Sequence, residues 1–313
     1  MFYRLRKLYS PEYYQGPNRN ARYFEGWYYK TVSRDGAFAL IPGVSRAPKD
    51  PHAFIQYLDG TTGKSAYHRF PIETFSYRRD RFEIAIGSNT FSRERYRVAL
   101  PEVECDVSIH DPVGWPSTLF SPGTMGWYSF VPFMECRHGI IVMDAAASGE
   151  VNGRQLDTGR LYVEKDFGRS FPNAWVWVQS NSFERTGVSL TCSVANVPFL
   201  GGAFTGFLVG FLVNDTLHRF TTYTGARLVG LELDHRMVRI VLEDRRSRLE
   251  IEADRTEGTD LPAPENGVMN SRVGESLRSN VRVELRLDGD RVFVGTGSSA
   301  GLEIVAAEKL VVR

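Results

Sequence analysis

A run of apolar and aromatic residues from 161 to 172 carries two carboxylic acids and a lysine. In an extended strand, Glu164 and Asp166 lie on one face and Lys165 lies on the other. A carboxyl group held in an apolar cavity gains proton affinity, so it can act as a general acid near neutral pH. Such a charge is also typical of an exposed, paired residue at a strand end, and both interpretations remain open. On the first interpretation, Glu164 is the leading candidate for a proton donor, and Asp166 is a neighbour that could share its proton.

A second segment, 131–138, also places charged side chains among apolar residues. Within it, Glu135 is the second candidate for a proton donor. His138 follows three residues later, at the end of the segment.

The segment after residue 174 alternates aromatic and apolar side chains before it becomes polar. Trp175, Trp177, Gln179 and Asn181 share one parity, so one strand face carries two indoles and then two amides. An apolar cavity with a few convergent polar groups is what a small-molecule site needs. A Trp-rich hydrophobic core with the two amides at the solvent-exposed end of the strand explains the same pattern equally well.

Most sequence signatures of cofactor and nucleophile chemistry are missing. The sequence has no Gly-x-Gly-x-x-Gly, no phosphate loop, no Gly-x-Ser-x-Gly and no His-Glu-x-x-His. Its three cysteines, Cys105, Cys136 and Cys192, are widely spaced and fit neither a zinc site nor a disulfide framework. We therefore expect neither a metal nor a cofactor.

The charge balance excludes some classes of partner. Lys and Arg number 38 against 37 Asp and Glu, and the formal charge of +1 gives no basic surplus for nucleic acid. The longest apolar run, 207–213, is far shorter than the roughly 20 residues of a membrane-spanning helix. The N-terminus is positively charged without an apolar stretch behind it, which argues against a secretory signal. We expect a cytoplasmic protein.

Most of the chain alternates polar and apolar residues in short runs that are cut by turn signals, the pattern of β-strands. Strands at this spacing predict an all-β protein of the sandwich or barrel type. We expect residues 1–20 to form an irregular arm. We expect residues 255–280 to form a polar loop with one helical turn at 275–279.

The chain also repeats itself at an offset of about 150 residues. His68 and the two residues after it recur at His218, and Trp27 faces Trp175 at a similar offset. We predict an internal duplication with a boundary near residue 150. The halves, 1–150 and 151–313, would each be a lipocalin-like barrel or a sandwich of common domain size.

Three motifs of this sequence resemble the tocopherol cyclase family. The first is Phe24-Glu25-Gly26-Trp27-Tyr28, similar to the Phe-Glu-Gly-Trp-Tyr opening of that family. The second, similar to its central signature, is Glu164-Lys165, Gly168, Phe171-Pro172, Trp175 and Trp177-Val178-Gln179. The third is Pro132 with Glu135, similar to its Phe-Pro-x-Phe-Glu-Pro-His segment. The plant enzymes place Asn where this chain has Asp166, and their His falls on Arg137.

The resemblance implies an enzyme that closes a chromanol ring from a prenylated hydroquinone, with an architecture similar to that of carotenoid hydratases and lipocalin-like cyclases. Their common chemistry protonates an isoprenoid double bond, and water or a phenol oxygen captures the cation. It needs one strong acid, a dry apolar pocket and aromatic faces. The acid would come from Glu164, Glu135 or Asp166. The substrate contacts would come from Trp27, Tyr28, Trp175, Trp177, Gln179, His138 and Lys165.

Three hypotheses follow. The chain is a cofactor-free cyclase or hydratase of the isomerase or lyase class, a non-catalytic lipocalin-like binder of an apolar isoprenoid or lipid, or an interaction scaffold. A buried carboxyl that faces a pocket favours the first, a pocket without an acid the second, and no pocket the third. The expected partner is a hydrophobic small molecule, with transient membrane contact for its uptake as an open option.

Overall fold

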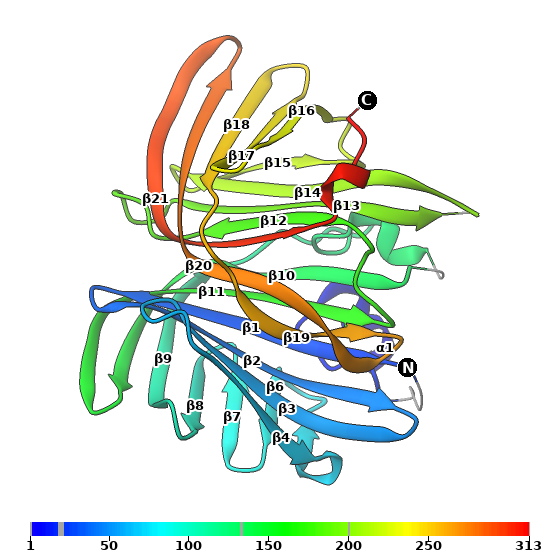
Figure 1. Ribbon diagram of the computed structural model, residues 1–313, viewed down its shortest axis with the longest axis vertical. Helices are drawn as coiled ribbons and strands as arrows, with labels where there is room; N and C mark the ends of the chain where they lie inside the picture. The colour runs from blue at the N-terminus through cyan, green and yellow to red at the C-terminus, as the bar shows by residue number, and fades with distance from the viewer. Residues whose placement is uncertain (1, 18–21, 132–133, 200, 313) are drawn as a thin grey trace. The chain divides into compact units, whose positions relative to one another are not determined.

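The computed structural model describes residues 2–17, 22–131, 134–199 and 201–312. The chain forms two compact units, which we call unit 1 and unit 2 (Figure 1). Unit 1 contains residues 1–59, 64–171 and 261–272, and unit 2 contains residues 60–63, 172–260 and 273–313. Strands dominate both units, which confirms the predicted all-β class.

Unit 1 is built on one eleven-stranded antiparallel sheet in the order β4-β3-β2-β1-β11-β10-β9-β8-β7-β6-β5. Its elements are α1 (Phe2–Tyr9), β1 (Phe24–Ser33), β2 (Gly36–Ala47), β3 (Asp50–Asp59), β4 (Ser65–Pro71), η1 (Ile72–Thr74), β5 (Phe75–Tyr77), β6 (Glu83–Ile86), β7 (Asn89–Ser92), β8 (Arg95–Ala99), β9 (Glu104–Val113), η2 (Gly126–Phe130), β10 (Cys136–Val151) and β11 (Arg154–Gly168).

The core of unit 1 shows that this sheet curls around itself. Leu40 of β2 and Ile55 of β3 belong to the same buried cluster as Ile84 of β6 and Phe91 of β7. Because β2 and β3 stand far from β6 and β7 in the strand order, only a strongly curved, barrel-like sheet brings them together. The residues that face this core alternate with outward ones, as in the exposed–buried alternation of β8.

Unit 2 is built on a ten-stranded sheet in the order β15-β14-β13-β12-β21-β20-β18-β17-β16, with β19 paired to β20. Its strands are β12 (Trp175–Ser180), β13 (Ser189–Phe199), β14 (Gly202–Val213), β15 (Thr216–Thr221), β16 (Arg227–Leu233), β17 (Met237–Glu243), β18 (Ser247–Asp254), β19 (Thr259–Glu265), β20 (Val268–Leu287) and β21 (Asp290–Val305), followed by η3 (Ala307–Lys309). Strands β19 and β20 both include residues that belong to unit 1.

The two sheets share one strand order, as the predicted duplication requires. In each, four consecutive strands form a meander, and the first strand of the meander pairs with the last long strand of its sheet, β1 with β11 and β12 with β21. His68 lies on β4 and His218 on β15, the fourth strand of each meander. Unit 1 extends the pattern by two short strands, β5 and β6.

The predicted equivalence of Trp27 and Trp175 is wrong. Trp27 belongs to the core cluster of unit 1, whereas unit 2 directs Val176 and Val178 of β12 into its core. Trp175 therefore points to the opposite face of its sheet. Side chains alternate along a strand, so an alignment that slips by one residue exchanges the two faces.

The chain leaves unit 1 after Phe171 rather than near residue 150. Residues 152–153 form the turn of the β10–β11 hairpin, and both strands of that hairpin belong to unit 1. After most of unit 2, the chain returns to unit 1 for residues 261–272. There Gln56 Nε2 donates to the carbonyl of Pro262 over 3.1 Å, and Ser45 Oγ donates to that of Gly267 over 2.7 Å.

Two local expectations are wrong. Residues 2–9 form helix α1 inside the expected irregular arm. The expected loop at 255–280 contains β19 and most of β20, and the expected helical turn at 275–279 lies inside β20. Pairing of β19 with β20, and of β20 with β21, supplies hydrogen bonds that local turn preferences do not predict.

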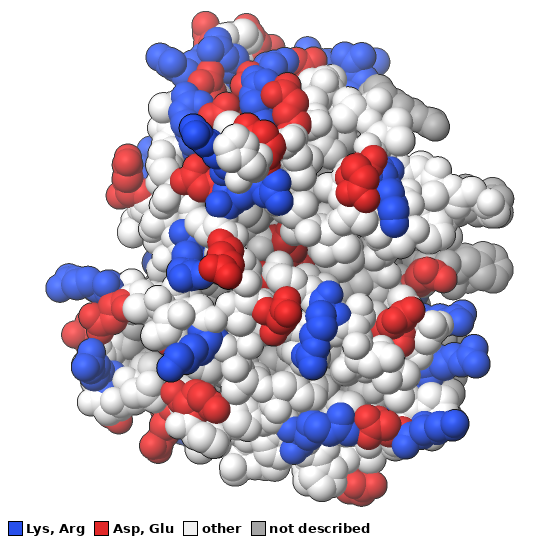
Figure 2. Space-filling model, viewed as in Figure 1, with Lys and Arg blue, Asp and Glu red and all other residues white. Residues whose placement is uncertain are grey.

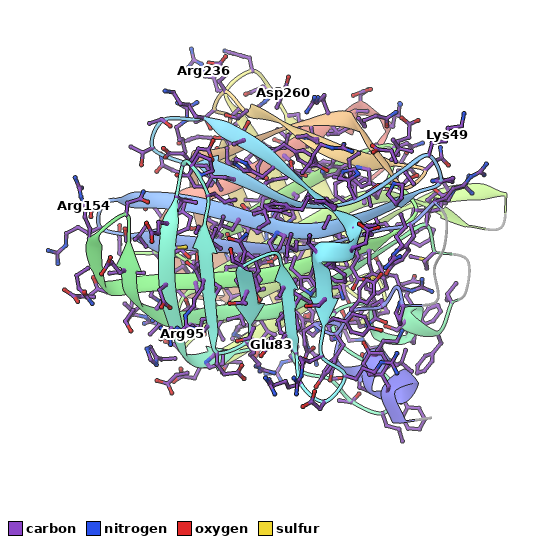
Figure 3. The ribbon with its side chains drawn as sticks, turned by 90° about the horizontal axis from the view of Figure 1, so that it is seen from below. Lys49, Glu83, Arg95, Arg154, Arg236 and Asp260 are labelled. Carbon is purple, nitrogen blue, oxygen red and sulfur yellow. The ribbon has the colours of Figure 1, made fainter. Side chains whose placement is uncertain are left out.

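Charged side chains lie mainly on the surface. On the face seen in Figure 2, Lys and Arg are interspersed with Asp and Glu, in keeping with the net charge of +1. Lys49 and Arg154 project outward from hairpin turns of unit 1 (Figure 3). Among the helices of the described residues, none is long and apolar enough to span a bilayer.

Candidate active site

The central strands of unit 1 gather titratable side chains on the face that is turned away from its core. Leu161 and Val163 of β11 point into the core, so Glu164 and Asp166 take the alternate positions beside them. Asp166 stands directly opposite His138 of β10 in the strand register. The prediction that Glu164 and Asp166 share one face is therefore confirmed.

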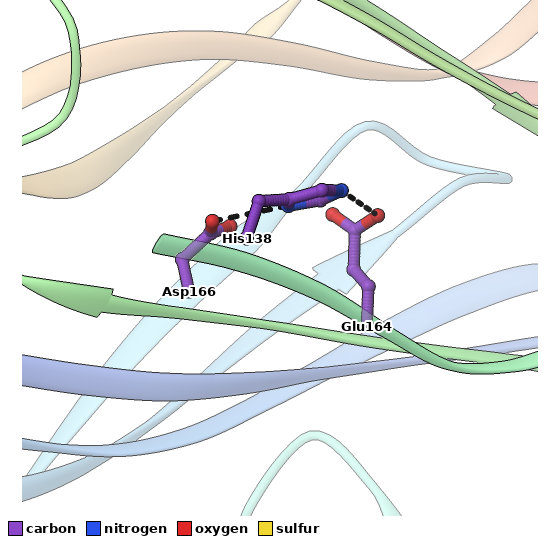
Figure 4. Close-up of side chains that lie close together, drawn as sticks. All are labelled: His138, Glu164 and Asp166. Carbon is purple, nitrogen blue, oxygen red and sulfur yellow. Dashed lines mark hydrogen bonds and ion pairs between the residues drawn. The ribbon is translucent and has the colours of Figure 1, made fainter. Parts of the chain in front are cut away.

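His138 lies between the two carboxyls (Figure 4). Its Nδ1 atom is 3.1 Å from Asp166 Oδ1, and its Nε2 atom is 3.7 Å from Glu164 Oε2. The side chains of His138 and Glu164 are 13% and 7% exposed, whereas that of Asp166 is 26% exposed. Each ring nitrogen thus faces its own carboxyl, Asp166 at hydrogen-bond distance and Glu164 at ion-pair distance. We call these three residues the carboxyl–imidazole chain.

Glu164 has a further partner on its own strand. The hydroxyl of Tyr162, two residues earlier on the same face, donates to Glu164 Oε2 over 2.5 Å. Tyr162 is fully buried, so this hydrogen bond is shielded from water. A hydrogen bond donated to a carboxyl favours its charged form, while burial favours its neutral form.

Cys136 lies next to this chain at the start of β10. Its Sγ atom is 3.8 Å from Asp166 Oδ1. Burial, followed by the nearby Asp166 carboxylate, raises the pKa of the Cys136 thiol well above its ordinary value. A protonated thiol is a poor nucleophile, so Cys136 offers no thiolate chemistry here.

His138, Glu164 and Asp166 could also supply three metal ligands, because one ligand atom from each lies within 4.8 Å of the others. The orientation of the imidazole fits that use poorly. Asp166 engages Nδ1 and Glu164 faces Nε2, whereas a metal ion binds a single ring nitrogen of a histidine. The arrangement fits proton transfer along the chain better than a shared ion.

Lys165 points the other way, into the interior of unit 1. Its Nζ atom is 2.5 Å from Glu25 Oε1, and both side chains are fully buried. The ammonium also lies over the ring of Trp27, 4.6 Å from its centroid. Burial outweighs the opposing effect of Glu25 and lowers the pKa of Lys165 to about 8. Lys165 is thus held by protein groups, on the face opposite to Glu164.

This ion pair holds residues 11–16, which we call the N-terminal arm. Lys165 Nζ donates to the carbonyls of Pro11 and Tyr13, each over 2.7 Å. Glu25 accepts hydrogen bonds from the backbone amides of Gln15 and Gly16 at 2.8 to 3.1 Å. Each charged group therefore satisfies backbone groups of the arm as well as its partner, which offsets the cost of burying both charges.

The arm forms part of the wall of a cavity in unit 1 with a volume of about 540 Å³. His138 and Glu135 also line this cavity, as does the segment that contains η2. Its wall combines apolar side chains with charged ones. The main lining residues are Lys7, Leu8, Pro11, Arg22, Pro122, Met125, Met134, Glu135, Arg137, His138, Phe167 and Arg169.

The other predicted site residues lie in three settings. Tyr28 stands opposite Glu164 in the register, on the outward face. Trp27 lies in the core, where its Nε1 donates to the carbonyl of Glu12 over 2.8 Å. Glu135 is exposed and lines the cavity. Pro132 lies outside the described residues.

Trp175, Trp177 and Gln179 belong to unit 2. All three are buried and point away from the core of that unit, because Val176 and Val178 point into it. Trp175 Nε1 donates to Glu303 Oε2 over 2.7 Å. The predicted shared face is confirmed within unit 2.

Sequence reasoning missed three contributors to the site. Tyr162 has the same parity as Glu164 and directly precedes it on that face, a signal that was available in the sequence. Glu25 belongs to a quoted motif, but its pairing with Lys165 depends on the register of β1 with β11. The contribution of Tyr23, whose hydroxyl donates to Glu25 over 2.5 Å, also depends on the fold.

Comparison with known sequences matches residues 90–306 to the family described as tocopherol cyclase-like. A probable chloroplastic tocopherol cyclase from Oryza sativa subsp. japonica is 26% identical over 235 residues, which cover 68% of this chain and 48% of that protein. A chloroplastic tocopherol cyclase from Zea mays is 27% identical over 230 residues, with the same two coverages. The match spans about half the length of these curated relatives.

Solved structures share the fold. CghA with Sch210972 superimposes with a TM-score of 0.57 at 11% identity, covering 91% of this chain and 89% of that one. Kievitone hydratase from Nectria haematococca gives a TM-score of 0.50 at 12% identity, covering 91% and 88%. Likeness at these identities extends to the fold alone.

Proposed function

This chain belongs to the tocopherol cyclase-like family, and we propose that it is an enzyme that cyclises or hydrates a prenylated, largely apolar substrate by acid catalysis without a cofactor. The observation that carries the proposal is the Glu164–His138–Asp166 chain, with Glu164 buried and hydrogen-bonded to Tyr162. A carboxyl–imidazole chain of this kind can donate a proton to the substrate through one residue and accept a proton from it through another. Acid-catalysed cyclisation needs both proton transfers.

Glu164 is the proposed proton donor. In its neutral form it gives a proton to one carbon of a trisubstituted double bond and leaves a tertiary carbocation at the other. Removal of the carboxyl from water keeps the neutral form accessible, and the Tyr162 hydroxyl supports the carboxylate that remains. Tyr28, opposite Glu164, offers an aromatic ring near the forming cation.

His138 and Asp166 are the proposed proton acceptor. In cyclisation, the phenol oxygen forms a bond to the carbocation and releases its proton to His138 Nε2, while Asp166 holds Nδ1. When the 3.7 Å gap between Nε2 and Glu164 Oε2 closes to hydrogen-bond distance, the imidazolium returns the proton to Glu164 and restores the donor. The sum is an isomerisation in which no atom is gained or lost. When water captures the cation, the same steps give a hydratase.

Glu164→Gln tests the proposal, because it keeps the shape of the side chain and removes its acid. A purified protein is incubated with a prenylated phenol, and the cyclic or hydrated product is measured. We expect Glu164→Gln to abolish turnover while substrate binding, measured by tryptophan fluorescence, stays within about twofold. Glu73→Gln is the matched control, because Glu73 is exposed and lies outside both the carboxyl–imidazole chain and the cavity. Glu135→Gln is measured beside it as the variant of the second candidate donor.

The competing outcomes are distinct. Full activity in Glu164→Gln with loss in Glu135→Gln would transfer the donor role to Glu135, the second candidate. Binding without turnover in the unmodified protein, across cyclisable and hydratable prenyl phenols, would overturn the enzyme proposal. That result would favour the non-catalytic binder, for which the 540 Å³ cavity gives room.

A further inference from the structure

The cavity of unit 1 carries an excess of positive charge. Four cationic side chains, Lys7, Arg22, Arg137 and Arg169, line it, and Glu135 is its one carboxylate among the described lining residues. The whole chain has a formal charge of +1, so this local excess is not a reflection of composition. Cations gathered around a concave surface raise the local concentration of anions.

Neutral oxygens orient three of these cations. Lys7 Nζ donates to the carbonyl of Gln15 over 2.9 Å, and Arg137 Nη2 donates to that of Val131 over 2.7 Å. Arg169 Nε donates to the side-chain oxygen of Asn266 over 2.8 Å. For Arg169, the hydrogen bond to a neutral amide oxygen fixes the guanidinium without cancelling its charge.

Arg169 is the most firmly placed of the four. Its backbone amide donates to the carbonyl of Glu135 over 2.7 Å, and its carbonyl accepts from the amide of Gly267 over 2.7 Å. The end of β11 at Gly168 passes so close to Glu135 that an added Cβ would stand 2.1 Å from the Glu135 carbonyl oxygen. These backbone hydrogen bonds and this close approach therefore fix the position of Arg169 at the cavity.

Phe167, which alternates with Asp166 along β11 and packs against the core of unit 1, lines the cavity together with His138. The described lining residues of the cavity do not include Glu164 or Asp166. Its remaining wall is largely apolar, with Leu8, Met125 and Phe167 among its members. A volume of about 540 Å³ accommodates a substituted aromatic ring. Cations and apolar walls together suit an aromatic or similar group that carries a negative charge.

We propose that this cavity is a binding site for an aromatic carboxylate. The carboxylate pairs with Arg169 and Arg22, and the ring packs against the apolar part of the wall. Glu164 and Asp166 are not among the described lining residues, so this site is separate from the acid of the function proposed above.

A matched pair of probes tests the proposal: 3-prenyl-4-hydroxybenzoate and its methyl ester, which differ in the negative charge. We expect the acid to bind at least ~10-fold more tightly than the ester at low salt, with the difference shrinking as sodium chloride is added. Arg169→Gln and Arg22→Gln should each weaken binding of the acid ~10-fold and leave the ester unchanged. Arg154→Gln, which removes the same charge from an exposed hairpin turn, should change neither.

Equal affinity for the acid and the ester would overturn the proposal, as would equal weakening by Arg154→Gln. If Arg169→Gln fails to fold, Arg22→Gln decides, because Arg22 is exposed. Turnover separates this proposal from the preceding one. Tight, arginine-dependent binding of the acid without turnover of either probe would leave the cavity assignment standing and remove the enzyme. Equal binding of the acid and the ester, together with turnover that depends on Glu164, would leave the enzyme proposal standing and remove the cavity assignment.

Discussion

Lys165 and Glu25 form an ion pair of 2.5 Å in which both side chains are fully buried. The pair connects β11 with β1, and its outer hydrogen bonds hold the N-terminal arm against the sheet. Glu164, the neighbour of Lys165 in the chain, points to the other face. The two adjacent charged residues of the motif thus have separate tasks, one in the fold and one in the candidate chemistry.

Lys165→Met should destabilise the protein by ~3–5 kcal/mol, because it leaves the Glu25 carboxylate buried without its partner. The free energy of unfolding in urea measures the effect. Lys49→Met removes a lysine from an exposed turn and should change that free energy by less than ~0.5 kcal/mol. Equal stabilities of the two variants would contradict the role given to the pair.

The ion pair should also leave a signature in the pH dependence of stability. The pKa of Lys165 is lowered from 10.5 to about 8 in the folded protein, chiefly by burial. Between these values the unfolded chain binds the proton and the folded one does not, so the stability contribution of Lys165 rises with pH across this window. This stability contribution does not change below pH 8 and reaches its full value above pH 10.5. The change in the free energy of unfolding between these limits is roughly 3 kcal/mol at most.

The double variant Lys165→Met/Glu25→Gln is the reference for this measurement, because other titrating groups cancel in the difference. The unfolding free energy of the unmodified protein minus that of the variant should increase from pH 8 to 10.5. A decrease of this difference over the same range would mean that Glu25 holds the pKa of Lys165 above its ordinary value.

Tyr162→Phe should slow turnover by ~10- to 100-fold, because the lost hydrogen bond supports the carboxylate that forms when Glu164 gives up its proton. The limb of the pH–rate profile that reports the acid should also move to higher pH. Tyr29→Phe is the control. It removes a buried hydroxyl that donates to the carbonyl of Ser92 over 2.9 Å, and it should lower stability without moving that limb.

Trp175→Ala should cost ~3–5 kcal/mol of stability, because the indole is 8% exposed and its Nε1 donates to Glu303. Thermal or urea unfolding measures this cost. Trp127→Ala provides the comparison, since that indole is 48% exposed, and it should stay within ~0.5 kcal/mol of the unmodified protein. The two variants should therefore differ clearly, and a similar loss in both would refute the packing role of Trp175.

Gly168→Ala should destabilise unit 1 by ~1–3 kcal/mol and weaken binding in its cavity. The new Cβ would stand 2.1 Å from the Glu135 carbonyl oxygen, and the backbone there has a φ of 154°. Gly274→Ala, whose Cβ would meet no heavy atom within 4 Å, should be nearly neutral. Ligand affinity and urea unfolding, measured on both variants, test the close approach of β11 to Glu135.

Alternation along single strands made much of this structure predictable. The parity of Glu164 against Lys165, and that of Trp175 with Trp177, follows from the two-residue period and holds in the fold. The equivalence of Trp27 and Trp175 failed for a related reason. Similar residues at similar offsets do not show which face meets the core, and a single-residue slip reverses the answer.

What the sequence could not reveal depends on which strands become neighbours. His138 reaches Asp166 because β10 pairs with β11 in one particular register, and Glu25 reaches Lys165 because β1 pairs with β11. The segment 255–280, rich in polar residues, becomes mostly strand because β19 and β20 pair with each other and β21 pairs with β20. The helix α1 was missed because eight residues are too few for a helical pattern to stand out.

The return of residues 261–272 to unit 1 has a consequence for the biosynthesis of the chain. The Lys165 bond to Pro11 joins residues 154 positions apart, and the Ser45 bond to Gly267 joins residues 222 apart. At ~5–20 residues per second, the ribosome needs roughly ten seconds or more to supply these partners. Until then, the edge of the aromatic strand β1 that pairs with β11 has no partner in the nascent chain. Nascent chains with unpaired strand edges aggregate or bind chaperones. Even then, the N-terminal unit is finished only when most of the C-terminal unit has been translated, so a nascent chain halted after Phe171 should remain incompletely folded.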